Sequence, residues 1–299
     1  AAAADVGAGL ASFATATCSL PRGGLATGAC ARGGGIGVGD RVMILMLNRP
    51  EFVEATLAAN RIGAIAVPVN FRLTPPELAF LVEDCQAAVL VTEPVLAAVG
   101  TAVRDIAPTL ATVVVAGAPT DGDVLGYEDL VAEDGDPAPA VDIPNDSQAL
   151  IMYTSGTTGR PKGVVRSHLA EIMGSMTMAI EVGFRHEDVI LHNKPLFHIA
   201  QFHLQLMPFI QLGGTNVLTR GFDVHETLSL VESEKITVLH GVPTQMVMLV
   251  AADRWWIPGL ARRLRARGDR GAAPRRARAK RGLFRPPHPS SRAPASRAG

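Results

Sequence analysis

The sequence predicts an α/β fold in which mostly parallel sheets are flanked by helices. Short runs that are apolar throughout recur along the chain, and segments with helical periodicity separate them. Strands without polar alternation are buried on both faces, as in a parallel sheet that helices cover on both sides. Hydrophobic residues make up 47% of the 299 residues, which can supply a sizeable core.

The first series of elements begins near Gly37. The run DRVMILML predicts a buried strand, and the amphipathic helix after it has Pro50 near its first turn and Gly63 after its end. Asp, Gly and Pro predominate between 118 and 147, which predicts a loose connection with a short helix at 127–133. The pattern predicts strands at 40–47, 64–70, 87–92 and 111–117, and helices at 49–63, 74–85 and 94–106.

The alternation of strands and helices resumes at Gln148. Pro208 is expected to kink the helix predicted at 199–214. The Met and Leu residues of helices 169–182 and 199–212 are expected to belong to the core, since helical spacing demands nothing else. The predicted strands are 148–154, 164–167, 188–193, 215–219 and 236–241, and the predicted helices are 168–183, 199–214, 223–235 and 243–252.

Two terminal segments differ from the middle of the chain. Ala and Gly dominate residues 1–35, where no period persists, so we expect a poorly ordered or out-of-frame segment. Residues 254–299 hold thirteen Arg, one Lys and one acid, a net charge of +13, whereas the preceding residues carry −13. This last segment is too poor in apolar residues to fold, which predicts a disordered basic tail. The predicted domain lies between them, at 36–253.

The three cysteines bear on location. Cys18, Cys30 and Cys85 are widely spaced and contain no CxxC pair, so neither a disulfide scaffold nor a zinc site is supported. No apolar run approaches the length of a transmembrane segment. The Ala-rich start contains Asp5 and no basic region, so it fits a signal peptide poorly. A reducing cytoplasm is the expected location.

The stretch YTSGTTGRPKG, residues 153–163, directly follows a predicted strand. Its glycines allow the main chain to approach an anion and to take positive φ, and its N–H groups and hydroxyls can converge on that anion. Lys162 adds a mobile positive charge. The Walker pattern is excluded, because Lys162 lies three residues beyond Gly159 and is followed by Gly163 and another strand. Any single Gly or Thr fits an ordinary turn, whereas the whole string favours phosphate binding.

The string YTSGTTGRPKGVVRSH resembles the phosphate-loop signature of the adenylate-forming superfamily, which includes acyl-CoA synthetases, luciferases and nonribosomal-peptide adenylation domains. The similarity continues through KPLFHIAQF, LGGTNVL and FDVHETLSLVESEKITVLHGVPTQM, and upstream through GDRVMILMLNRPEFVEATLAANRIGAIAVPVNFRLTPPEL. It covers residues 36–252 and is most like that of fatty-acyl or aryl-CoA ligases. The resemblance implies part of the large N-terminal domain of such an enzyme.

The resemblance also implies a reaction in two steps. A carboxylate such as a fatty acid attacks the α-phosphate of Mg²⁺-bound ATP to give acyl-adenylate and pyrophosphate, and the thiol of CoA then displaces AMP. Backbone N–H donors, Lys162 and Mg²⁺ would stabilise the charge that builds on phosphate oxygens. In such enzymes the glycine loop handles the β- and γ-phosphates, which implies phosphate contacts from Thr154, Ser155, Gly156, Thr157, Thr158, Gly159 and Lys162.

Other site residues are implied by their places in the family's motifs. Thr154, the first loop threonine, is implied to touch the metal. His198 in PLFH matches the residue beside the carboxylate and the adenylate, which makes His198 and Lys162 the catalytic candidates. An isolated histidine is more often structural, and only the motif reverses that expectation. The string HGVPT implies that the acyl pocket is flanked by Gly241, Val242, Pro243 and Thr244.

Several later motifs of the family do not occur in the sequence. After PTQMVML we expect a Gly-Gly-Ala segment, an aromatic–Gly–x–Thr–Glu motif, a Thr-Gly-Asp motif, a hinge and a C-terminal domain with a catalytic lysine. We therefore expect a partial ligase without its C-terminal domain, either inactive or only ATP-binding. Since Arg, Ala, Pro and Gly have codons rich in G and C, we hypothesise that 254–299 and 1–35 are out-of-frame translation.

Two other interpretations stay open. One is a working ATP-dependent enzyme that another polypeptide completes. The other is a nucleic-acid binder, because the arginine-rich tail would attract phosphate backbones without sequence preference. That tail lacks the interleaved aromatics that base stacking uses, so no specific nucleic acid is expected. Apolar central strands without neighbours would leave sheet faces exposed, which predicts a partner chain or aggregation.

Overall fold

The computed structural model describes residues 35–132, 141–154 and 160–252, all within one compact unit, Ala1–Trp255. Residues 1–34 and 253–299, on which most of the predicted unordered segment and the predicted tail fall, lie outside the described residues. No helix of the described part combines the length and apolar character that crossing a membrane requires.

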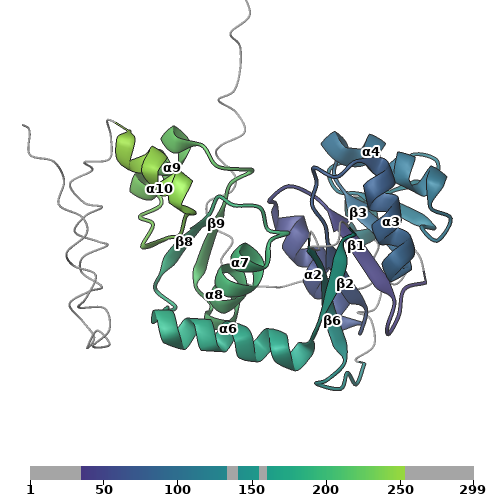
Figure 1. The fold of residues 1–299 in the computed structure, drawn as a ribbon, viewed down its shortest axis with the longest axis horizontal. Helices are drawn as coiled ribbons and strands as arrows, with labels where there is room; N and C mark the ends of the chain where they lie inside the picture. Colours follow the sequence, from purple (N-terminus) through teal and green to yellow (C-terminus); the bar gives the residue numbers. More distant parts are fainter. Residues whose placement is uncertain (1–34, 133–140, 155–159, 253–299) are drawn as a thin grey trace, which may run out of the picture. The chain divides into compact units, whose positions relative to one another are not determined.

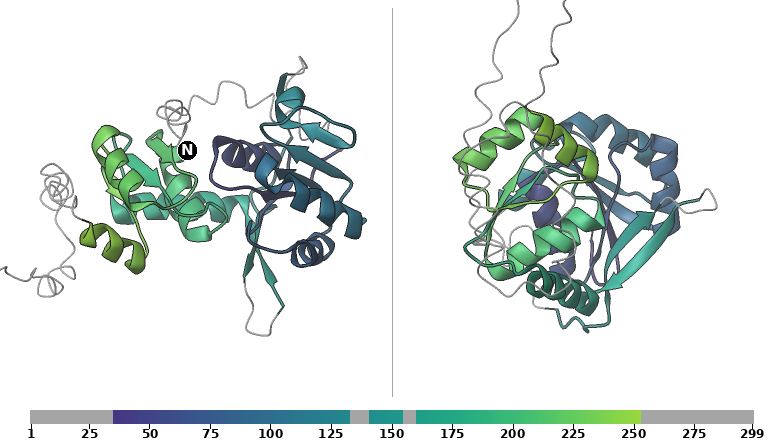
Figure 2. Two further views of the ribbon diagram at one scale, coloured as in Figure 1. Left: turned by 90° about the horizontal axis from the view of Figure 1, so that it is seen from above. Right: turned by 60° about the vertical axis from the view of Figure 1, so that its left-hand side comes forward.

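The larger sheet has seven strands within these ranges. They are β1 (Arg41–Leu45), β2 (Ile65–Pro68), β3 (Ala87–Thr92), β4 (Thr112–Val115), β5 (Val124–Gly126), β6 (Gln148–Thr154) and β7 (Lys162–Ser167). Their spatial order is β5-β4-β3-β1-β2-β6-β7. Neighbouring strands are parallel except β6 and β7, which form an antiparallel hairpin at one edge of the sheet (Figure 2).

The smaller sheet has three parallel strands in the order β10-β8-β9, with bounds β8 (Val189–His192), β9 (Thr215–Leu218) and β10 (Val238–Leu239). The helical segments are α2 (Pro50–Arg61), α3 (Pro75–Cys85), α4 (Pro94–Ile106), α5 (Tyr127–Ala132), α6 (His168–Val182), α7 (Ile199–Gln201), the π-helical turn η1 (Phe202–Leu206), α8 (Met207–Leu212), α9 (Val224–Ser233) and α10 (Pro243–Ala251). The predicted α/β class with mostly parallel, helix-flanked sheets is confirmed.

Strand β1 shows why these runs are apolar throughout. Successive side chains of a strand point to opposite faces of the sheet. Val42 and Ile44 belong to one buried cluster with Phe52 of α2, whereas Met43 and Leu45 belong to a second cluster with α3 and α4. Figure 1 shows α2 on one side of the larger sheet and α3 and α4 on the other. Helices therefore cover both faces, and every position of β1 is buried or nearly so.

Two predicted features differ from the structure. Strand β5 was not predicted, because its three residues VLG lie in a polar connection and become a strand only by pairing with β4. The predicted helix 199–214 is interrupted by η1, directly before Met207 and Pro208. Proline has no N–H to donate to the preceding turn, and that turn is where the wider π-helical geometry occurs.

Helix α6 begins with a Ser167 side chain that accepts from the Ala170 N–H, and it ends at Gly183 with φ of 72°. The prediction that its Met and Leu residues belong to the core is wrong. Met173 is 53% exposed and Met176 is 48% exposed. Helical spacing predicts that a helix has an apolar face, but it does not predict which element packs against that face. The described residues leave this face of α6 largely exposed.

Candidate functional site

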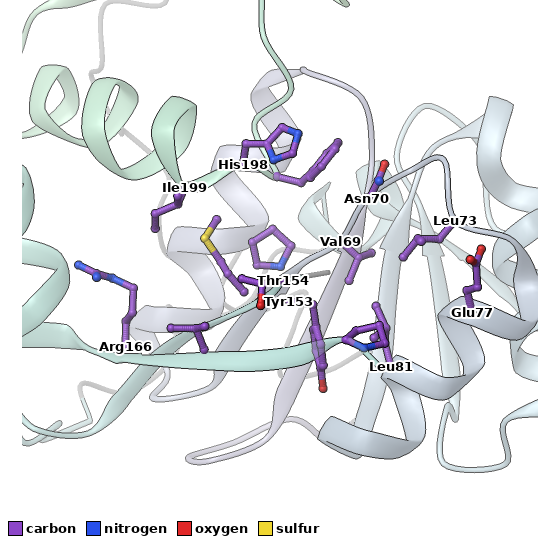
Figure 3. A pocket seen from close by; sticks show the side chains of 15 residues that line it. Val69, Asn70, Leu73, Glu77, Leu81, Tyr153, Thr154, Arg166, His198 and Ile199 are labelled. Atoms are coloured by element: carbon purple, nitrogen blue, oxygen red, sulfur yellow. The ribbon is translucent and has the colours of Figure 1, made fainter. Parts of the chain in front are cut away.

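A pocket of about 620 Å³ lies at the carboxyl ends of β2 and β6, which are neighbouring parallel strands. In open α/β sheets the carboxyl edge is where ligands bind. Its walls come from the loop after β2, helix α3, the end of β6, strand β7 and the loop after β8 (Figure 3). The lining residues are Pro68, Val69, Asn70, Leu73, Glu77, Leu81, Met152, Tyr153, Thr154, Pro161, Val164, Arg166, Phe197, His198 and Ile199.

Most of this lining is apolar, which suits a ligand with an apolar body and a few polar groups. The polar groups are mostly engaged. Glu77 accepts from the Thr74 N–H at 2.8 Å and caps α3. The Tyr153 hydroxyl donates to Asp84 at 2.5 Å, and burial together with that carboxylate raises the Tyr153 pKa. Tyr153 therefore stays protonated.

Thr154 and Lys162 face each other at the end of the hairpin where the connecting loop begins and ends. Thr154 ends β6, Lys162 begins β7, and the two are partners in the antiparallel register. The Thr154 hydroxyl donates to the Lys162 carbonyl oxygen at 3.4 Å. Both residues are exposed, and only Thr154 lines the pocket. The other predicted phosphate contacts lie outside the described residues: Ser155, Gly156, Thr157, Thr158 and Gly159.

His198 lines the same pocket from the loop after β8. It precedes the first turn of α7, and its ring packs on Phe197 with the ring centroids 4.2 Å apart. Burial lowers the His198 pKa, and the positive charges of Arg72 and Lys194 lower it further. The imidazole is therefore held neutral, with one N–H donor and one acceptor. The structure thus brings Thr154 and His198, from distant parts of the sequence, to one pocket (Figure 3).

The predicted acyl-pocket segment is not part of this lining. Gly241 lies between β10 and α10, Val242 is the N-cap residue of α10, and Pro243 and Thr244 begin that helix. Val242 is 47% exposed. None of the four residues is among those that line the pocket, so their role at the acyl group stays a prediction.

Arg166 of β7 lines the pocket and is fixed by α6 and η1. Its guanidinium pairs with Glu171 and lies 2.9 Å from Nε2 of His203. Because Arg166 can only donate, Nε2 of His203 accepts, and its Nδ1 donates to Glu171 at 2.7 Å. Burial opposes the ionisation of Glu171, but these two hydrogen bonds hold its pKa below the ordinary value. Figure 3 shows the Arg166 side chain directed away from His198. Its contacts with Glu171 and His203 connect β7 of the hairpin to α6 and η1.

Asn48 holds the loop that carries His198. Its side chain is buried, donates to the Lys194 carbonyl at 2.8 Å and accepts from the Leu196 N–H at 2.8 Å. Neither Asn48 nor Lys194 was singled out from the sequence, although both follow buried strands as polar residues, which is a usable signal. Arg166 lies within the string YTSGTTGRPKGVVRSH, but it was not singled out, because a charged residue on an exposed edge strand is ordinary.

No group of three or more His, Cys, Asp or Glu side chains in the described ranges could hold a metal ion. Thr154 offers a single hydroxyl, whereas Mg²⁺ requires near-octahedral oxygen coordination. The implied contact of Thr154 with Mg²⁺ therefore stays a prediction, and the described residues by themselves form no magnesium site.

A mostly parallel α/β sheet, a glycine-rich hairpin at its edge and a PLFH histidine in the same pocket define the N-terminal domain of the adenylate-forming enzymes. Residues 28–281 match the AMP-binding enzyme family, and the chain belongs to that family.

Relatives of known name include CoA ligases for different acids. The chain is 35% identical over 226 residues to a feruloyl-CoA synthase of an Amycolatopsis species, which covers 75% of this chain and 43% of that protein. It is 34% identical over 213 residues to the long-chain-fatty-acid–CoA ligase FadD13 of Mycobacterium tuberculosis, which covers 70% of this chain and 40% of that protein. The chain thus spans about two fifths of the length of these relatives.

Solved structures give the same family. ATP-bound MatB from Rhodopseudomonas palustris is similar with a TM-score of 0.71 at 28% identity, over 80% of this chain and 46% of that one. The anthranilate CoA ligase AuaEII in complex with anthranoyl-AMP is similar with a TM-score of 0.72 at 26% identity, over 78% of this chain and 45% of that one. Nothing in these comparisons supports the nucleic-acid interpretation.

Proposed function

We propose that the chain binds Mg–ATP and a carboxylic acid and serves the adenylation step of an acid–CoA ligase in the cytoplasm. Family membership and relatives named for CoA ligases support this proposal. One observation carries it: Thr154, at the start of the glycine loop, and His198 line one pocket. A phosphate bound by the loop and a carboxylate beside His198 would therefore meet.

In the proposed step a carboxylate oxygen bonds to the α-phosphorus while the bond to the leaving pyrophosphate breaks. Negative charge grows on phosphate oxygens, so N–H donors of the loop 154–162 and the ammonium of Lys162 stabilise the transition state. Mg²⁺ bound to ATP would supply neutralisation of phosphate charge. The neutral His198 donates one hydrogen bond that orients the carboxylate. CoA then takes the acyl group and releases AMP.

The acid has an apolar body in this proposal, because the pocket is lined mainly by aliphatic and aromatic side chains. The relatives named above act on feruloyl and long-chain fatty-acyl groups, so either an aryl or a fatty acid is consistent with them.

Calorimetric titration with Mg–ATP tests the proposal. The wild-type chain is expected to bind one nucleotide, and Lys162→Met is expected to weaken binding by about tenfold, the effect of one charge-assisted hydrogen bond. Lys235→Met is the matched control, since Lys235 is an exposed lysine of the turn before β10. Absence of nucleotide binding by the wild type, or equal loss in both variants, would contradict the proposal.

A further inference from the structure

The place of His198 in the pocket depends on its backbone and on packing against the Phe197 ring, because its side chain forms no hydrogen bond with the described residues. His198 begins the turn α7, in which the N–H groups of Gln201 and Phe202 donate to its carbonyl oxygen, each at 3.0 Å. Ile199, the first residue of this turn, lines the same pocket (Figure 3). A helical turn of three residues has no stability of its own, so contacts outside the turn have to hold it.

The Gln201 side chain connects this turn to the smaller sheet. Gln201 is 1% exposed, and its Nε2 contacts Nδ1 of His192, the fully buried last residue of β8. Nε2 of His192 lies 2.9 Å from Oδ1 of Asn216 in β9. The Asn216 amide group in turn donates to the Gly214 carbonyl oxygen at 3.2 Å. Three buried side chains thus connect β9, β8 and α7 by hydrogen bonds.

The donor and the acceptor of each of these hydrogen bonds follow from the chemistry of the groups. Since the Asn216 amide nitrogen donates to Gly214, its Oδ1 accepts from the Nε2–H of His192. Burial lowers the His192 pKa to about 4, so the imidazole is neutral near neutral pH and its Nδ1 is an acceptor. Nε2 of Gln201 is the donor to that nitrogen. A side chain without an N–H at position 201 could not form this bond.

The backbone at His198 is held on both sides. Before it, Asn48 bonds to the Lys194 carbonyl and to the Leu196 N–H, each at 2.8 Å. After it, Gln201 is the last residue of α7, and the π-helical turn η1 follows directly. The wider geometry of η1 interrupts regular α-helical hydrogen bonding, so η1 does not extend α7 as a continuous helix. The contact of Gln201 with His192 is therefore the side-chain anchor on this side.

We propose that Gln201 is a positioning residue for His198, because its hydrogen bond to His192 fixes the α7 turn and thereby holds the imidazole where the carboxylate binds. This inference rests on the proposed function, which places a carboxylate beside His198. Gln201 does not line the pocket, so its effect on a ligand passes through His198. A ligand with an acyl group is thus affected by Gln201, whereas a nucleotide alone is not.

Calorimetry with AMP and with a hexanoyl-adenylate analogue, in which a sulfamoyl group replaces the phosphate, tests this inference on the full chain. Gln201→Met removes the donor at similar length and is expected to weaken the analogue about tenfold and to leave AMP unchanged. In the His198→Ala background the same substitution is expected to weaken the analogue no further, since both changes remove one contact. Equal weakening of both ligands, no weakening, or additive effects of the two substitutions would overturn the inference.

Gln205→Met is the matched control. Gln205 is a buried glutamine of η1 whose side chain forms no hydrogen bond with the described residues. Its replacement is expected to leave the ratio of the two affinities as in the wild type. A loss of that ratio equal to the loss in Gln201→Met would show a general effect of buried glutamines on the fold and would contradict positioning by Gln201.

NMR of the histidine rings needs no ligand and separates this inference from the proposed function. The His198 signal is the one that His198→Ala removes. In Gln201→Met the His198 pKa is expected to rise toward the ordinary 6.5, since the ring leaves the place where burial and nearby positive charge lower it, and in Gln205→Met it is expected to stay unchanged. An unchanged His198 titration in Gln201→Met overturns the inference. A wild type that binds neither Mg–ATP nor the analogue contradicts the proposed function instead.

Discussion

Replacement of Lys194 by Met is expected to stabilise the folded protein near neutral pH. In the folded protein burial lowers the pKa of the amine from its ordinary 10.5 to about 8. One pKa unit corresponds to about 1.4 kcal/mol. At a pH where the amine is charged in both the folded and the unfolded state, its burial therefore lowers the free energy of unfolding by roughly 3 kcal/mol. The lost hydrogen bond to His240 offsets about 1 kcal/mol of this, which leaves a net gain of about 2 kcal/mol.

The pH dependence of this stability difference tests whether burial of the Lys194 charge causes it. The pKa of Lys194 is about 8 in the folded protein and 10.5 in the unfolded chain. Between these two pH values the unfolded chain therefore binds more protons than the folded protein. The free energy of unfolding of the wild type therefore rises with pH through this window. The variant lacks that rise, so its advantage is full below about pH 8 and is lost by about pH 10.5.

Urea denaturation followed by circular dichroism measures the free energy of unfolding at a series of pH values. Lys235→Met is the matched control, since an exposed lysine carries no burial cost, and it is expected to change little. A Lys194→Met variant less stable than the wild type near neutral pH would refute the reasoning. A stability difference that does not change between pH 8 and 10.5 would refute it equally.

Two further predictions concern the residues that hold the site. Asn48→Ala leaves two buried backbone groups unpaired and is expected to lower the free energy of unfolding by about 2–3 kcal/mol in urea denaturation, whereas the exposed Asn145→Ala changes little. Equal stability of the two variants would contradict this. Glu171→Gln removes the charge between Arg166 and a buried imidazole and is expected to cost roughly 3 kcal/mol, with the exposed Glu181→Gln as control. A decrease in the free energy of unfolding below about 1 kcal/mol would show that the ion pairs of Glu171 with Arg166 and His203 contribute little.

The apolar strands could be predicted from the sequence because burial on both faces leaves a direct mark on composition. The bounds of β3 and β6 match the predicted 87–92 and 148–154. Strand β5 could not be predicted, because only its pairing with β4 makes it a strand. The order of the strands in the sheet likewise depends on long-range pairing that local patterns do not encode.

The candidate site divides in the same way. Thr154 and His198 could be singled out because each lies in a distinctive string. Lys194 lies in the same string as His198, yet its importance depends on the absence of a carboxylate nearby, which only the three-dimensional arrangement reveals. Arg166 is similar, since its partners Glu171 and His203 come from two other elements.

Binding of a nonhydrolysable acyl-adenylate analogue, with a sulfamoyl group in place of the phosphate, tests most directly whether nucleotide and carboxylate meet in the pocket of Thr154 and His198. We predict that the wild-type chain binds this analogue at least about tenfold more tightly than AMP, because it occupies both parts of the pocket. His198→Ala should weaken binding of the analogue and leave binding of AMP unchanged. Equal affinities for the analogue and AMP, or a His198→Ala variant that weakens both alike, would contradict a shared site.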